Sequence, residues 1–138
     1  MPLDAGRVKP MSRGSTKNAR VEDTQLGAGE IAIQVFPGSG HSTVAVTGRV
    51  TVDSSPNVRA VVLELLRRGS APVVVIDLSG VSYLDMSGLA TLLESLKAAR
   101  ERSVKLRVIG MSGEARNLAE IAQLDTIFHA WGSEVEYR

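Results

Sequence analysis

Val73-Val-Val-Ile-Asp-Leu-Ser-Gly-Val-Ser-Tyr-Leu-Asp-Met-Ser-Gly-Leu89 is the stretch of sequence that decides the fold. It begins as an apolar run typical of a strand buried on both faces, continues through a short polar turn, and opens into an amphipathic helix. Ser87 falls in the first turn of that helix. A hydroxyl at a strand-to-helix junction can be reached by another protein, and phosphorylation would give it a charge of roughly −1.5 to −2. The stretch therefore predicts an α/β fold and indicates a switch at Ser87.

The composition is that of a single soluble domain with room for a tail. The chain has 138 residues, of which 43% are hydrophobic and 22% are charged, and domains cluster near ~100–150 residues. Its net charge of +1 gives no strong field toward nucleic acid or a membrane surface. Cysteine is absent, which excludes disulfides and thiolate sites. Because no apolar run approaches the ~18 residues of a membrane span and no secretory signal is visible, we expect a cytoplasmic protein.

Residues 1–29 differ from the rest of the chain. They contain five basic and three acidic residues, a balance of +2, whereas the remaining residues include 11 basic and 12 acidic ones, a balance of −1. Their few apolar residues follow neither the helical nor the strand period. Such a segment cannot bury enough surface to offset its ordering entropy. We therefore predict a flexible, mildly basic tail over residues 1–29, either an unstructured leader or a partner-binding arm, followed by one domain over residues 30–138.

Strand and helix patterns alternate from Glu30 onward. Ser55-Pro56 is typical of a helix start, with a capping hydroxyl followed by proline. In the last predicted helix, Leu118 and Ile121 are expected to be buried. Strands are predicted over residues 31–36, 43–50, 72–78, 104–109 and 127–131, and helices over about 55–68, 86–102 and 112–122. The order β-β-α-β-α-β-α-β predicts a single α/β domain with a mixed, mostly parallel sheet that begins with a β-hairpin.

The residues around Ser87 allow two interpretations. Asp85, Ser87 and Gly88 together are ordinary helix-start chemistry, with Asp85 as the cap, and need no further purpose. The functional interpretation rests on Gly88, whose missing side chain lets another molecule come close. It also rests on the sheet, because sites in open α/β sheets form at the carboxyl ends of strands, where residues 77–88 are expected.

Catalytic and metal-binding functions find little support in the sequence. A serine nucleophile needs a base within hydrogen-bond reach, and the only two histidines are expected in the first turn, at His41, and on the last strand, at His129. Residues 85–89 do not form a Gly-x-Ser-x-Gly elbow, and the histidines and carboxylates match no metal-ligand spacing. Gly38-Ser-Gly40 lacks the Lys-Ser/Thr of a phosphate loop. We therefore predict a protein that is not an enzyme, with no catalytic residues, metal site or cofactor.

The segment Asp77-Leu-Ser-Gly-Val-Ser-Tyr-Leu-Asp-Met-Ser-Gly-Leu89 resembles the signature of STAS domains, particularly those of bacterial anti-sigma factor antagonists. Val46-Thr-Gly-Arg-Val50 is similar to the second strand of these domains, and Ser55-Pro56 is similar to the start of their first helix. Residues 104–128 are similar to their closing strand–helix–strand unit. The resemblance covers about residues 30–131, and it implies a STAS-like domain over residues 30–138.

The resemblance implies a protein switch. In that family the serine matching Ser87 is phosphorylated by an anti-sigma factor that is itself a serine kinase, and a metal-dependent serine phosphatase reverses the mark. The unphosphorylated protein binds the anti-sigma factor and thereby releases a sigma factor, without direct contact with nucleic acid. We expect a monomer or weak dimer without a membrane span. The implied partner-binding residues are Asp53, Asp85, Met86, Ser87, Gly88 and Thr91.

Two positions depart from the family pattern. Met86 stands where the family often has a second serine, which leaves Ser87 as the acceptor and adds a soft apolar contact beside it. Thr51 replaces a common aspartate, whose role Asp53 could take. The alternative function is a constitutive STAS assembly subunit of a transporter or stress-sensing complex, without reversible phosphorylation. Nucleotide binding by the domain itself ranks below both, because no phosphate-cradling loop is present.

Overall fold

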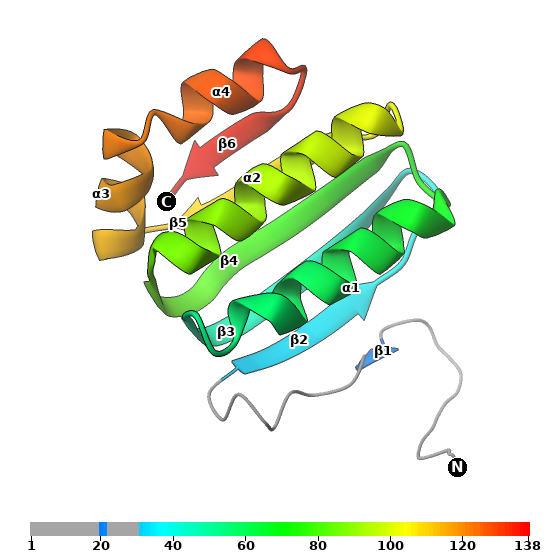
Figure 1. Ribbon diagram of the computed structural model, residues 1–138. Helices are drawn as coiled ribbons and strands as arrows, with labels where there is room; N and C mark the ends of the chain where they lie inside the picture. The colour runs from blue at the N-terminus through cyan, green and yellow to red at the C-terminus, as the bar shows by residue number, and fades with distance from the viewer. Residues whose placement is uncertain (1–19, 22–30) are drawn as a thin grey trace.

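A computed structural model of the chain describes residues 20–21 and 31–138. The predicted tail at 1–29 therefore lies outside the described residues, except for the short strand at Arg20–Val21. The described strands form one six-stranded sheet, accompanied by four helices (Figure 1). The strands are β1 (Arg20–Val21), β2 (Ile31–Phe36), β3 (His41–Val50), β4 (Val73–Leu84), β5 (Lys105–Met111) and β6 (Glu134–Tyr137). The helices are α1 (Ser55–Arg68), α2 (Met86–Glu101), α3 (Gly113–Ile121) and α4 (Leu124–Ala130).

The sheet is antiparallel at one edge and parallel elsewhere. The strands lie in the order β1-β2-β3-β4-β5-β6, and β2 pairs antiparallel with both of its neighbours. The predicted hairpin of β2 and β3 runs from Ile31 opposite Gly48 to Phe36 opposite Thr43. From β3 to β6 each strand is parallel to the next, and each connection passes through helix, as parallel crossovers require. The predicted mixed, mostly parallel α/β fold is confirmed.

One face of the sheet bears the core. Leu106 and Val108 of β5 are fully buried, whereas Lys105 and Arg107 beside them belong to the opposite face and form ion pairs with Glu134. α1 and α2 pack against each other and lie side by side across the sheet (Figure 1). None of the helices in the described part of the chain is long and apolar enough to cross a membrane. The core-facing residues of these two helices include Val58, Val62, Leu65, Leu66, Leu89, Leu92 and Leu96.

β4 continues six residues past its predicted end at Leu78, so the expected polar turn there is wrong. After Asp77 the strand no longer pairs with β5, but it keeps β3 as a neighbour as far as Leu84. Gly80 allows this close pairing, because a side chain built on it would approach Thr47 Cγ2 to 2.5 Å. The extension places the β4–α2 junction beyond the end of the β4–β5 pairing.

The predicted last strand over residues 127–131 is also wrong. Residues Leu124–Ala130 form α4, which buries Leu124 and Phe128 on one helical face. The last strand, β6, follows this helix and pairs parallel with β5. His129 consequently lies on a helix, where it is exposed.

Two details of the helices differ from the predictions as well. Ile121 is 81% exposed instead of buried, because α3 ends there and Gln123, in the left-handed conformation, turns the chain into α4. Leu118 is half-buried. At the start of α1 the N-cap position is occupied by Ser54 and not by Ser55, and the Ser54 side chain does not cap the helix.

Gly88 lies where α2 begins over the ends of β3 and β4. It is buried, and a side chain built on it would approach Leu84 Cγ to 2.8 Å and Val50 Cγ1 to 3.0 Å. Both neighbours are themselves buried, and close-packed interiors leave such side chains little room to move. The missing side chain therefore serves contact within the chain, in contrast to the approach of another molecule that the sequence suggested.

Replacing Gly88 by Ala should lower the free energy of unfolding by about 1–2 kcal/mol, because overpacking is destabilising and outweighs the ~1 kcal/mol that Ala gains over Gly in a helix. Urea denaturation measures this change. Gly40→Ala is the control, since a side chain there meets nothing within 4 Å, and it should leave stability nearly unchanged. A Gly88→Ala protein that is more stable than the wild type contradicts the packing.

Candidate protein-docking site at the start of α2

Asp85 holds the first turn of α2 in place. Its Oδ1 atom accepts hydrogen bonds from the backbone N–H groups of Ser87 at 2.8 Å and of Gly88 at 3.1 Å. These N–H groups have no partner inside the helix, so the carboxylate satisfies two of the open donors of the helix N-terminus. The predicted cap is confirmed, and the backbone of Ser87 is fixed by the side chain of Asp85, two residues earlier.

The loop between β3 and α1 is tied to the same junction. The N–H of Asp85 donates to the carbonyl oxygen of Val50 at 3.1 Å. Within the loop, the hydroxyl of Ser54 donates to the carbonyl oxygen of Arg49 at 2.7 Å and accepts from the N–H of Thr51 at 2.9 Å. The end of β3 and the start of α2 are therefore joined by a backbone hydrogen bond, and the loop that follows β3 is held by the Ser54 side chain.

Sequence reasoning missed the role of Ser54. This residue is 1% exposed, and its hydroxyl replaces the backbone partners that a tight loop leaves unpaired. The only available signal was the run Ser54-Ser55-Pro56, in which the position of proline favours Ser55 as the cap. In the structure Ser54 occupies the cap position, and its hydroxyl is bound by Arg49 and Thr51, which lie outside that run.

The exposed part of the junction contains four of the predicted partner-binding residues. Met86 is 63% exposed, Asp53 is exposed, and Asp85 and Ser87 are half-buried. Val52, which sequence reasoning did not select, is 66% exposed. The accessible groups are therefore the hydroxyl of Ser87, two apolar side chains and two carboxylates. We call this surface, made of Val52, Asp53, Asp85, Met86 and Ser87, the Ser87 junction.

The other two predicted partner-binding residues, Gly88 and Thr91, face inward. Thr91 is only 5% exposed, and Gly88 is buried. The carbonyl oxygen of Thr91 accepts a hydrogen bond at 2.8 Å from the buried hydroxyl of Ser95, one turn later in α2. In the free chain these residues support the helix, and a partner approaching the junction meets the exposed group first.

Two cations near the junction are engaged by other side chains. The guanidinium of Arg49 lies over the ring of Tyr83, 4.4 Å from its centroid. Arg59 of α1 forms an ion pair with Glu94 of α2, with Nε and Oε1 2.9 Å apart. Arg59 and Glu94 are both about half exposed at their side chains, and such surface pairs contribute little to stability. The ion pair links α1 and α2.

Both histidines lie on elements other than α2, which contains Ser87. His41 pairs with Val73 at the start of β4, whereas Ser87 follows the end of that strand. His129 lies on α4. Among the residues that the structure describes, no group of three or more His, Cys, Asp or Glu side chains could hold a metal ion.

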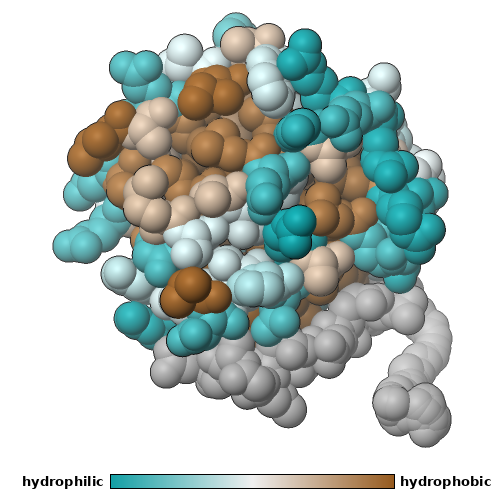
Figure 2. All heavy atoms as spheres, viewed as in Figure 1, coloured by the Kyte–Doolittle hydropathy of each residue, from teal (hydrophilic) through white to brown (hydrophobic). Residues whose placement is uncertain are grey.

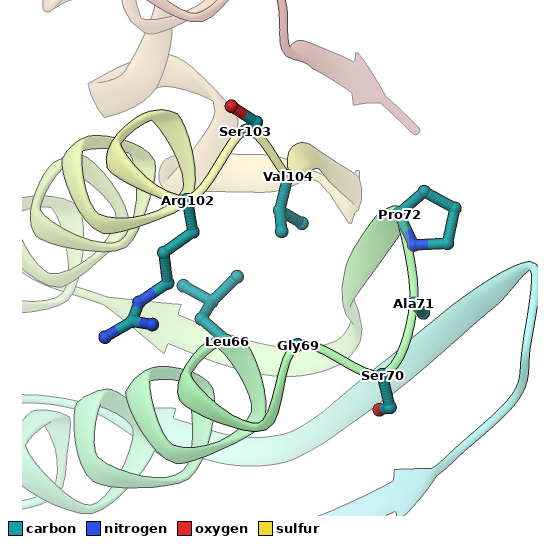
Figure 3. Close-up of a pocket in the computed structure, with 8 residues that line it drawn as sticks. All are labelled: Leu66, Gly69, Ser70, Ala71, Pro72, Arg102, Ser103 and Val104. Carbon is teal, nitrogen blue, oxygen red and sulfur yellow. The ribbon is translucent and has the colours of Figure 1, made fainter.

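A shallow pocket of about 530 Å³ lies at the opposite end of β4, where α1 and α2 end (Figure 3). Figure 3 shows Leu66 and Val104 on either side of the hollow, with Arg102 at its edge. Among the described residues that line it, Arg102 alone is ionisable. The polar side chains of the lining are those of Ser70, Arg102 and Ser103. The pocket is separate from the Ser87 junction.

Comparison with known proteins identifies the family. A family model described as "Mlab, STAS domain" matches residues 36–129. The chain is 32% identical over 94 residues to the anti-sigma-B factor antagonist of Staphylococcus aureus strain NCTC 8325 / PS 47, which covers 67% of this chain and 86% of that protein. It is 31% identical over 96 residues to the anti-sigma-B factor antagonist of Listeria monocytogenes, covering 70% of this chain and 83% of that one.

Among solved structures, the crystal structure of an anti-sigma factor antagonist from Mycobacterium paratuberculosis has the same fold. The two superpose with a TM-score of 0.64 at 26% sequence identity, over 71% of this chain and 82% of that chain. The match to the family model includes the β3–α1 loop and the β4–α2 junction. The chain therefore belongs to the STAS domain family, in which the relatives described above are named anti-sigma factor antagonists.

Proposed function

We propose that the protein is an anti-sigma factor antagonist controlled by phosphorylation of Ser87. The unphosphorylated form binds an anti-sigma factor that is also a serine kinase, and this binding releases a sigma factor. Phosphorylation of Ser87 abolishes the binding, and a metal-dependent serine phosphatase restores it. The protein works in the cytoplasm by binding and not by catalysis. The observation that carries the proposal is the half-buried Ser87, whose backbone is fixed by Asp85 and which directly follows the exposed Met86.

The names of the relatives support the antagonist role. Two of them are anti-sigma-B factor antagonists more than 30% identical to this chain, and each is covered over more than four fifths of its own length. A protein of this kind needs an accessible surface for its partner and a means of changing that surface. The Ser87 junction offers both.

An uncharged serine suits a protein interface. Its hydroxyl can be desolvated at modest cost if it finds one hydrogen-bond partner. A phosphate at the same place has roughly −1.5 to −2 charge and three acceptor oxygens. Removing that charge from water without pairing it costs several kcal/mol, and every 1.4 kcal/mol changes an affinity tenfold. Phosphorylation therefore acts mainly on docking.

Asp85 makes the phosphate still less compatible with the junction. Helix N-termini bind phosphate through free N–H groups, but those of Ser87 and Gly88 already donate to Asp85 Oδ1. A phosphate on Ser87 either displaces the carboxylate or lies beside its negative charge. In both cases the capped junction loses free energy, through a broken cap or through repulsion between like charges.

Ser87→Ala should bind the anti-sigma factor with a Kd close to that of the wild type, whereas Ser87→Asp should bind at least about 100-fold more weakly, because an unpaired charge enters the interface. Isothermal titration calorimetry with the purified anti-sigma factors of the same genome measures both. Ser112→Asp is the matched control, because it adds the same charge at an exposed serine that begins α3, and it should bind normally. Equal affinities of Ser87→Ala and Ser87→Asp contradict the switch and favour a constitutive assembly subunit.

Phosphorylation should also lower the melting temperature of the free protein, and Asp85→Asn should reduce that loss. The amide oxygen of Asn can still accept the two backbone hydrogen bonds but has no negative charge to repel the phosphate. Calorimetric melting of both forms of each protein measures the difference. Asp85→Ala, the control, should be about 1 kcal/mol less stable even without phosphate, since it loses the cap. A phosphate that leaves the wild-type melting temperature unchanged contradicts the proposed competition.

A further inference from the structure

Few of the large apolar side chains among residues 31–138 are strongly exposed. Figure 2 shows apolar groups between hydrophilic ones on the helical side of the molecule. Five such residues are exposed, namely Phe36 at 39%, Val52 at 66%, Met86 at 63%, Ile121 at 81% and Trp131 at 38%. Trp131 is covered in part by the guanidinium of Arg100, 4.5 Å from its ring centroid. Two of the three most exposed, Val52 and Met86, belong to the Ser87 junction.

We propose that Val52 and Met86 form a two-residue apolar anchor that enters a pocket on the anti-sigma factor and determines which anti-sigma factor this chain accepts. The inference rests on the proposed function and deepens it, since it states what the partner must offer. That partner presents an apolar pocket to Val52 and Met86, a neutral group to the hydroxyl of Ser87, and a basic residue at the rim near Asp53.

The backbone attaches both anchor residues to the junction that contains the serine. Met86 directly precedes Ser87 and follows the capping residue Asp85. Val52 lies two residues after Val50, whose carbonyl oxygen accepts the N–H of Asp85 at 3.1 Å. The backbone of the anchor is therefore set on two fixed loop ends, so little backbone entropy is lost when a partner covers it.

The chemistry of the two side chains fits a protein partner. Methionine is flexible and polarisable, so it fills irregular apolar pockets, whereas valine is stiff at χ1 and gives the contact a defined shape. Covering them removes water from around Ser87, which strengthens the unfavourable effect of a phosphate there. The anchor thus connects affinity with phosphorylation, because the same contact that excludes water makes the charge harder to accommodate.

The charges around the anchor favour an anti-sigma factor with a basic rim over the other possible occupants. Asp53 and Asp85 give this surface two carboxylates, which repel anionic lipid headgroups. In a symmetric dimer formed through this surface, they would also repel the same carboxylates of the second copy. A protein partner with an apolar pocket and a nearby Lys or Arg is complementary to both features.

The test replaces each anchor residue by serine. Met86→Ser and Val52→Ser should each raise the Kd for the anti-sigma factor about 10-fold or more, as expected for losing a buried apolar contact, and should make the binding heat capacity change less negative. Their melting temperatures should match the wild type, because both side chains are exposed in the free protein. Ile121→Ser is the matched control, since it removes a more exposed apolar side chain on α3, and it should leave the Kd unchanged.

Calorimetric titration uses the full chain and each purified anti-sigma factor of the same genome. If Ser87→Asp abolishes binding while Met86→Ser and Val52→Ser bind like the wild type, the anchor is wrong and the proposed function stands. An equal loss in Ile121→Ser also overturns the anchor, because the effect would then not belong to this surface. If the wild type binds none of these proteins, or forms a dimer or binds anionic vesicles through Met86, the proposed function and the anchor fail together.

Discussion

The carboxylate of Asp85 is the constraint on which the functional part of this structure depends. Its Oδ1 atom accepts the N–H groups of Ser87 and Gly88, while its own N–H donates to the carbonyl oxygen of Val50. One residue thereby ends β4, begins α2 and attaches the end of β3. Gly88 lets this happen at close range, because any side chain there would meet Leu84 and Val50. The fold thus holds the backbone of Ser87 in a defined place.

In the proposed switch, the same arrangement lets phosphorylation of Ser87 have a large effect on binding. Two of the N–H donors that could bind a phosphate already donate to Asp85 Oδ1, and this carboxylate is itself negatively charged. Around the serine, the exposed Val52 and Met86 supply apolar surface of the kind that interfaces cover. An interface that excludes water there tolerates a hydroxyl and rejects a charge. In the proposed switch, stability and docking therefore depend on one junction, and docking is the more sensitive of the two to a phosphate.

The sequence predicts this junction well because its determinants are local. The apolar run of β4, the cap at Asp85 and the start of α2 are all adjacent in the chain. The continuation of β4 was missed because Ser79 and Gly80 have turn propensity, which pairing with β3 overrides. Residues Ile127-Phe128 have strand propensity, yet Phe128 is buried on a helix through tertiary contacts. The inward orientation of Thr91 depends on packing against segments distant in sequence, whereas the hydroxyl of Ser54 is bound by its near neighbours in sequence, Arg49 and Thr51.

The central claim is that Ser87 is reversibly phosphorylated in the cell, and phosphopeptide mass spectrometry of the protein isolated from its own cells tests it most directly. The peptide spanning Ser87 should contain a phosphate under some growth or stress conditions and lose it under others, and the phosphate should be absent when Ser87 is replaced by alanine. A peptide that stays unmodified under all conditions, or a phosphate assigned to another residue, would contradict the account.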